Sequence, residues 1–340
     1  MAAGFPPAEA AQFGNFVAGV TVQKIFQTGT ASPAEIIAIG KNPDYVYKPE
    51  LADDPRRSVF ISGTDIEIIE KFSLPGKVTH AIFDHDGTIS TLREGWEKIM
   101  EPMMIRAILG AKYESADEGD YLRVANRVRE YIDKTTGIQT LEQMRGLVDM
   151  VKEFGFVEKQ KILDEFGYKK IYNKALLDIV NDRLLRLLKG EHSVYDYTMK
   201  GAVDFLECLY KAGVKLYLAS GTDQEDVEKE AATLGYAHLF EGKIYGSVGD
   251  IKKEAKRIVL EKIMKDVGTQ NTARLVVFGD GPVEIREARR RGAMAIGVAS
   301  DEIRRFGINT TKRKRLIHAG AHYIIPDFAQ QSAITKLIKL

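Results

Sequence analysis

The sequence predicts an α/β fold: a parallel sheet flanked by helices, with a mostly helical domain inserted after the first strand. The C-terminal half alternates short hydrophobic runs with amphipathic helical stretches, which is the pattern of a parallel sheet. Residues 93–199 instead repeat apolar side chains at helical spacing, with hardly any strand signal. A direct crossover between parallel strands needs only about thirty residues, so we expect this long insert to be a separate domain.

The predicted strands are continuous apolar runs, as expected for strands buried on both faces. They are Val78–Phe83, Lys215–Ala219, Leu275–Phe278, Met294–Val298 and Tyr323–Ile325. Helices with an apolar face are predicted between them, and most are followed by a glycine, which suits a helix C-terminus. They are Ala202–Lys211, Asp223–Leu234, Lys253–Val267 and Pro282–Arg291. Residues 77–92 and 200–340 therefore form the predicted core, and residues 93–199 form a cap above the C-terminal ends of the strands.

Residues 1–76 form a third region. We expect residues 1–40 to be a helical segment, with one helix over Ala8–Val22 and a second, shorter helix after a turn rich in Gly, Thr and Ser. Residues 41–76 are predicted to be an extended linker, because Asn42–Arg57 combines several prolines with many charges and little periodicity.

Composition excludes several classes of protein. The chain has 340 residues and a formal net charge of +1, so no global charge favours nucleic acid or a membrane surface. The single cysteine, Cys208, rules out an intramolecular disulfide framework and fits a reducing compartment. We find neither a hydrophobic run long enough to cross a membrane nor a secretory leader. These features predict a cytoplasmic protein that binds neither nucleic acid nor membrane.

The first chemical signal is VTHAIFDHDGT, in which a buried strand runs directly into Asp84 and Asp86. Strand alternation places residues two apart on the same side, so both carboxylates can face one pocket. Gly87 lets the chain turn there. One carboxylate can then attack covalently while the other exchanges a proton.

Three further segments carry polar groups where a strand ends or a helix begins. Ser220, Gly221 and Thr222 follow a strand at the start of a helix, where a hydroxyl and free N–H groups can hold an anion. Lys252 and Lys253 begin the next helix, where the helix dipole disfavours a cation, so one of them is a candidate phosphate ligand. The third segment carries two acids that suit Mg²⁺, namely Asp280 and Glu284.

Taken together and in this order, the four segments resemble the motifs of the haloacid dehalogenase-like (HAD) hydrolases, over roughly residues 77–340. The resemblance implies a Rossmann-like parallel sheet core of HAD type. The helical insert resembles the cap of the branch that contains phosphoglycolate phosphatase and β-phosphoglucomutase. The family's motifs correspond to Asp84 to Thr88, Ser220, Lys252 or Lys253, and Asp280 with Glu284.

The resemblance also implies roles for these residues. Asp84 would be the nucleophile that forms an aspartyl-phosphate, and Asp86 the general acid and base. The Asp84 carboxylate, the Asp86 backbone carbonyl and Asp280 would hold Mg²⁺, with Glu284 helping directly or through water. Ser220, Gly221, Thr222 and a lysine would bind the phosphoryl oxygens, and we prefer Lys253 to Lys252. Neighbouring carboxylates are expected to raise the pKa of Asp86.

Two residues depart from the family pattern. His85 stands where an apolar or aromatic side chain is commoner, and we expect it to be structural and to point away from the pocket. Glu284 stands where Asp is common, so the metal contact would be longer or would include a water.

In the cap, the polar turn KTTGIQT is either an ordinary turn between helices or a loop over the active site. In the second case Thr135, Thr136 and Gln139 would contact the leaving group. Arg93, Arg123 and Arg145 are further candidates for a second anionic group.

The stretch Glu9–Ile39 weakly resembles the C-terminal end of ribokinase-type (PfkB) sugar kinases, and it carries none of a kinase's catalytic residues. This likeness favours a phosphorylated sugar as substrate. The predicted function is a Mg²⁺-dependent phosphatase acting on a small phosphorylated metabolite. A phosphomutase of the β-phosphoglucomutase type and a catalytically silent sugar-phosphate-binding protein stay open as alternatives. The sequence makes no prediction of oligomeric state.

Overall fold

A computed structural model describes residues 4, 6–21, 30–41, 46–135, 138, 140–247 and 255–340. The chain divides into two compact units, Met1–Tyr47 and Lys48–Leu340. The first unit contains helices α1 (Pro7–Thr21) and α2 (Pro33–Lys41). Helix α2 begins with a capping box: the Ser32 backbone N–H donates to the Glu35 carboxylate, and the Glu35 N–H donates to the Ser32 hydroxyl.

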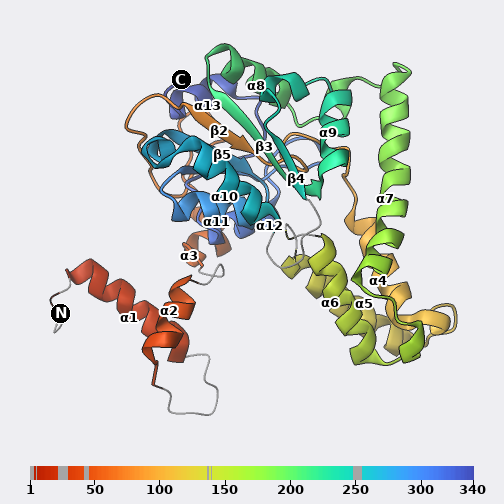
Figure 1. Cartoon of the computed structure of the whole chain (residues 1–340). Coiled ribbons are helices and arrows are strands. Elements are labelled where there is room, and N and C mark those ends of the chain that lie inside the picture. The colour runs from red at the N-terminus through yellow and green to blue at the C-terminus, as the bar shows by residue number, and fades with distance from the viewer. Residues whose placement is uncertain are drawn as a thin grey trace. The chain divides into compact units, whose positions relative to one another are not determined.

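The second unit contains a seven-stranded sheet with the order β1-β7-β6-β5-β2-β3-β4 (Figure 1). All neighbouring strands are parallel except β1, which pairs antiparallel with β7. The strands are β1 (Glu67–Ile68), β2 (His80–Phe83), β3 (Lys215–Asp223), β4 (Ile244–Ser247), β5 (Leu275–Gly279), β6 (Met294–Val298) and β7 (Tyr323–Ile325). The predicted α/β fold with a parallel sheet is therefore confirmed. The edge strands β1 and β4 were not predicted.

Strand alternation divides the core into two apolar layers, one on each face of the sheet. Phe83 of β2 faces one layer, where it stacks on Phe278 of β5 at a centroid distance of 4.8 Å and contacts Phe205 of α8. Ile82 faces the other layer, which α10, α11 and α12 cover. The core helices are α3 (Pro49–Asp53), α8 (Ala202–Lys211), α9 (Gln224–Thr233), α10 (Ala255–Val267), α11 (Pro282–Arg290), α12 (Thr310–His318) and α13 (Gln331–Leu337).

The insert between β2 and α8 is helical, as Figure 1 shows. Its helices are α4 (Glu97–Leu109), α5 (Glu118–Thr135), α6 (Thr140–Phe154) and α7 (Glu165–Leu188). Its apolar side chains join the same buried cluster as one face of the sheet. No helix among the described residues is both long and apolar enough to span a membrane.

Residues 48–76, which we predicted to lie within an extended linker, belong to the second unit. They form α3 and β1, and Glu67 of β1 makes a buried ion pair with Arg313 at 2.6 Å. Arg313 also donates to the backbone carbonyls of Leu51 and Ala52. The prolines and charges that suggested a linker thus belong to a segment that Arg313 ties to the core.

Candidate active site

The ends of the central strands bring together residues from three of the four predicted motifs. β2 lies between β3 and β5 in matched register, with Phe83 opposite both Leu218 and Phe278. Asp84, Gly221 and Asp280, which follow these register positions, all line one pocket. The third predicted motif, with Lys252 and Lys253, lies outside the described residues.

Asp84 comes directly after β2 and is almost completely buried, with 5% of its surface exposed. Its backbone N–H donates to the carbonyl of Phe278 at 2.9 Å. The parallel ladder therefore continues one residue beyond β2. The nucleophile candidate is thus held between two strands that are buried along their whole length.

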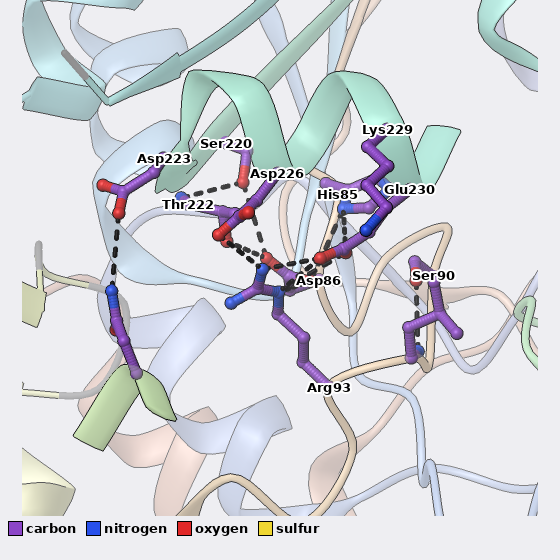
Figure 2. A network of polar contacts seen from close by, with 12 residues as sticks. His85, Asp86, Ser90, Arg93, Ser220, Thr222, Asp223, Asp226, Lys229 and Glu230 are labelled. Atoms are coloured by element: carbon purple, nitrogen blue, oxygen red, sulfur yellow. Dashed lines mark hydrogen bonds and ion pairs between the residues drawn. The ribbon is translucent and has the colours of Figure 1, made fainter. Parts of the chain in front are cut away.

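Asp86 lies in the turn after β2, where Gly87 has a φ of 73°. The hydroxyls of Thr222 and Ser220 donate to its Oδ2 atom at 2.8 and 3.4 Å (Figure 2). The Nδ1 atom of His85 lies 3.4 Å from Oδ1. Asp86 of the first predicted motif is therefore hydrogen-bonded to Ser220 and Thr222 of the second.

The pKa of Asp86 differs from our expectation. Burial by itself raises it, but hydrogen bonding and charge from His85, together with Arg93 and Thr222, hold the pKa well below its ordinary value. The prediction that neighbouring carboxylates raise the pKa is wrong, because His85, Arg93 and Thr222 together lower it. Asp86 is therefore ionised.

His85 is fully buried and is not among the pocket-lining residues, in keeping with the expected structural role. Its Nε2 atom lies 2.7 Å from the hydroxyl of Tyr236. Its other ring nitrogen, Nδ1, faces Asp86 Oδ1, so the buried imidazole lies directly beside the acid/base candidate.

The predicted metal ligands also meet. Asp84, Asp280 and Glu284 each offer a carboxylate oxygen, and these three atoms lie within 4.8 Å of one another. A Cβ added at Gly87 would overlap the Asp280 carboxylate, which shows that this carboxylate packs directly against the turn that carries Asp86. Carboxylate and carbonyl oxygens suit Mg²⁺, so the residues present fit this ion.

Glu284 has a second task. It is 1% exposed, and its Oε1 atom accepts the N–H of Gly281 at 2.8 Å. Glu284 thereby caps the first turn of α11 and fixes the loop that carries Asp280.

The phosphate-binding candidates differ in access. Gly221 and Thr222 line the pocket. Ser220 is fully buried, and its hydroxyl accepts the N–H of Thr222 at 3.0 Å. This contact shapes the turn at the end of β3.

The candidates in the cap turn are less well placed. Thr135 does not line the pocket, and its hydroxyl donates to the carbonyl of Tyr131 at 2.7 Å. Thr136 and Gln139 lie outside the described residues. Arg123 pairs with Asp120 on the surface, and Arg145 pairs with Glu142 within the cap.

The cap wall of the pocket consists mainly of residues that the sequence analysis did not select. Helix α7 contributes four side chains within about two turns, at the spacing of a single helical face. The lining residues from α6 and α7 are Thr140, Gln143, Lys169, Tyr172, Asn173 and Leu176. The last four residues are spaced i, i+3, i+4, i+7, and this spacing could have identified them in the sequence as one face of a helix. The spacing alone does not show whether that face of the helix lies toward the core.

One cap residue is paired with the core across the pocket. Lys169 Nζ lies 2.8 Å from Asp223 Oδ1, where Asp223 is the residue just before α9. Arg93, from the segment that leads into the cap, lines the same pocket. Only two basic side chains therefore line it among the described residues, whereas the acidic ones are Asp84, Asp86, Asp223, Asp226, Asp280 and Glu302.

The fold is therefore a mostly parallel α/β sheet with paired carboxylates directly after β2 and a helical insert that lines the same pocket. The family model of the haloacid dehalogenase-like hydrolases matches residues 78–292, so the chain belongs to this family. The match begins after the segment that resembles a sugar kinase, so that resemblance stays a prediction. Curated proteins provide no match.

Solved structures with a similar arrangement include a predicted phosphatase, a β-phosphoglucomutase and a phosphate complex. A predicted phosphatase from Clostridium acetobutylicum has 18% identity and a TM-score of 0.47, covering 78% of this chain and all of that one. A β-phosphoglucomutase from Clostridium difficile has 15% identity and a TM-score of 0.49, covering 77% and 97%. CbbY from Rhodobacter sphaeroides, solved with phosphate, has 19% identity and a TM-score of 0.44, covering 74% and 96%. Likeness at this level does not transfer an activity.

Proposed function

We propose that this hydrolase is a Mg²⁺-dependent phosphatase that cleaves a small phosphomonoester through an aspartyl-phosphate on Asp84. The observation that carries the proposal is the meeting of Asp84, Asp86 and Asp280 in one pocket at adjacent strand ends. Phosphoryl transfer needs positioned groups and neutralised charge more than it needs elaborate covalent chemistry.

In the first step, a carboxylate oxygen of Asp84 attacks phosphorus. The bond between phosphorus and the leaving oxygen breaks, its electron pair stays on that oxygen, and Asp86 supplies the proton. In the second step, a water oxygen attacks phosphorus while Asp86 takes the proton. The bond from phosphorus to Asp84 breaks, which restores the carboxylate and releases phosphate.

An ionised Asp86, which its lowered pKa favours, suits the second step directly. The first step needs Asp86 protonated, and a phosphoryl group beside it favours that state because like charges raise the pKa of a carboxyl. Asp84, Asp280 and the Asp86 carbonyl would hold Mg²⁺, with Glu284 as a further candidate. When bound, the ion would offset the negative charge that these carboxylates and the phosphoryl oxygens place together.

The cap wall favours a hydroxylated leaving group such as a sugar. Gln143 and Asn173, whose amide nitrogens also donate to Thr135 and Asp223, and Thr140 with its hydroxyl are polar groups that can pair with hydroxyl groups. These side chains, rather than those of the predicted cap turn, are our candidates for substrate selection.

The test is a phosphate-release screen with Mg²⁺ over sugar phosphates, phosphoglycolate, nucleotides and phosphonates, with Asp84→Asn as the matched control. We expect release from at least one sugar phosphate by the natural sequence and none by the control. Formation of an isomer from a hexose 1-phosphate, without free phosphate, would instead identify a mutase. Equal release by the natural sequence and the control would reject the proposal.

A further inference from the structure

A buried arginine lies beside the proposed acid/base. Arg93 Nη2 is 2.6 Å from Glu230 Oε1 and 3.4 Å from Asp226 Oδ2, and its Nε atom donates to Glu230 Oε1 at 3.1 Å. The same Nε atom is 3.8 Å from Asp86 Oδ1. Figure 2 shows the guanidinium between Asp86 and the two carboxylates of α9.

This cluster joins distant parts of the chain. Arg93 belongs to the segment that leads from β2 into the cap, whereas Asp226 and Glu230 lie on α9 of the core. The side chain of Glu230 is 2% exposed and that of Arg93 is 12% exposed. Because Glu230 uses two nitrogens of Arg93, the guanidinium is held in one orientation.

The backbone that carries Arg93 is fixed from the other side. Arg183 of α7 donates from Nη1 to the carbonyls of Leu92 at 2.6 Å and of Glu94 at 3.0 Å. Its Nη2 atom lies 3.2 Å from Glu94 Oε2. The two residues that flank Arg93 are therefore anchored to the last helix of the cap.

The Asp86 carboxylate is consequently constrained on both oxygens. Thr222 and Ser220 donate to Oδ2, while His85 and Arg93 face Oδ1. Glu230 keeps Arg93 on the Asp86 side, because a guanidinium that binds Glu230 through two nitrogens is not free to turn toward Asp84. Arg93 therefore acts on the orientation of the acid/base.

We propose that Arg93, held by Glu230 and by Arg183, is a positioning residue for Asp86. The inference rests on the proposed function, in which Asp86 activates the water of the second step. Misplacement of a reacting group by about 1 Å can cost on the order of 100-fold in rate. Loss of Arg93 should therefore slow breakdown of the aspartyl-phosphate.

The test compares Arg93→Gln, Arg93→Lys and Glu230→Gln on 4-nitrophenyl phosphate, in rapid-mixing and steady-state experiments. The good leaving group spares the first step, so we expect a burst of nitrophenol followed by turnover slowed about 100-fold. KM should fall together with kcat, which leaves kcat/KM nearly unchanged. Arg93→Lys should behave like Arg93→Gln, because lysine cannot make the two-nitrogen contact.

Controls separate the other roles that Arg93 could have. Arg129→Gln removes a cap arginine that pairs with Glu101 outside the pocket, and it should leave both parameters unchanged. A raised KM in Arg93→Gln would make Arg93 a substrate ligand and would overturn the inference. A lowered kcat with KM unchanged, or full activity in Arg93→Lys, would overturn it as well.

Two further measurements cover failure of folding and failure of the proposed function. If Arg93→Gln does not fold, Arg183→Gln should give the same burst in weaker form, and its absence would contradict the inference. If the natural sequence releases no phosphate, the proposed function fails by itself. The contact is then tested by thermal unfolding of Arg93→Gln, Asp86→Asn and the double variant, where additive shifts in Tm would reject it.

Discussion

The Nζ atom of Lys312 lies 2.8 Å from Oδ2 of Asp280, so the proposed metal ligand forms an ion pair with a lysine of the same chain. Glu302 lies 2.6 Å from the same ammonium group, and Ser300 accepts from it at 3.2 Å. Burial alone would lower the pKa of Lys312, but the charges of Asp280 and Glu302 raise it above its ordinary value. Lys312 is therefore charged, and it offsets two carboxylates beside the pocket.

Lys312→Met should destabilise the protein by about 3 kcal/mol without Mg²⁺, because it leaves two partly buried carboxylates without their cation. Added Mg²⁺ should recover more of the Tm in this variant than in the natural sequence, since the ion replaces part of the missing charge. Thermal unfolding with and without Mg²⁺ measures both effects. Lys314→Met removes an exposed lysine of the same helix that pairs with Asp53, and it should change little. Equal losses in the two variants would contradict a special role for Lys312.

Asp84→Asn should abolish turnover, by at least about 10³-fold, because an amide oxygen is too weak a nucleophile to attack phosphorus. The aspartyl-phosphate should also disappear from fluoride-trapping experiments. Folding should persist, since the backbone N–H of Asp84 still bonds to the Phe278 carbonyl. Phosphate release near the natural rate would show that another group is the nucleophile.

Asp280→Asn should raise the Mg²⁺ concentration needed for half-maximal activity by at least about 100-fold. This effect is larger than the one expected from losing a residue that only hydrogen-bonds to a metal ligand, because Asp280 would bind the ion directly. Activity should also stop when a chelator removes divalent ions, because the acidic pocket then repels a phosphate dianion. Mg²⁺ titrations of phosphate release at saturating substrate distinguish weaker Mg²⁺ binding from weaker substrate binding. Full activity in excess chelator would remove the metal from the mechanism.

Asp86→Asn should slow the two chemical steps unequally. An aryl phosphate needs little protonation of its leaving group, so its first step is spared and the aspartyl-phosphate accumulates. An unactivated sugar phosphate should lose about 10²-fold or more and show no burst. Rapid-mixing experiments on both substrates distinguish these cases. Equal losses with no trapped intermediate would limit Asp86 to shaping the turn.

Stability should fall in mild acid because of His322, which is buried between the sheet and Phe72. Burial, with nearby Arg289, lowers the pKa of His322 to about 4. Its Nδ1 atom accepts the N–H of Ala295 at 2.9 Å and therefore has to be unprotonated. The pKa of a histidine in an unfolded chain is about 6.5. Between pH values of about 4 and 6.5, the unfolded chain therefore binds more protons at this residue than the folded protein does.

The free energy of unfolding should accordingly drop as the pH falls from about 6.5 to about 4, by roughly 3 kcal/mol from this residue. Denaturant unfolding at several pH values measures the slope. His322→Asn keeps an acceptor for Ala295 without titrating and should flatten the curve, whereas exposed His238→Asn should not. Parallel curves for the natural sequence and His322→Asn would contradict the assignment.

The sequence determined the features that depend on local pattern. Buried parallel strands are nearly continuous apolar runs, so β2, β3, β5, β6 and β7 were predicted close to their observed positions. Functional groups of such sheets follow the strands directly, which is how the sequence pointed to Asp84, Asp86 and Asp280, and these three residues line one pocket. The edge strands β1 and β4 lack this pattern, because both are short and neither is a continuous apolar run.

Tertiary structure alone decided which charges face one another. Arg93 and Glu230, Lys312 and Asp280, and Lys169 and Asp223 are pairs that join separate elements of the chain. Nothing in the local pattern of a lysine or arginine distinguishes a solvated side chain from one that is buried against a distant carboxylate. Burial strengthens these contacts by removing water from them, and burial depends on how the helices pack on the sheet. The sequence therefore determined where the chemistry lies, and the packing of the chain determined the charges that control it.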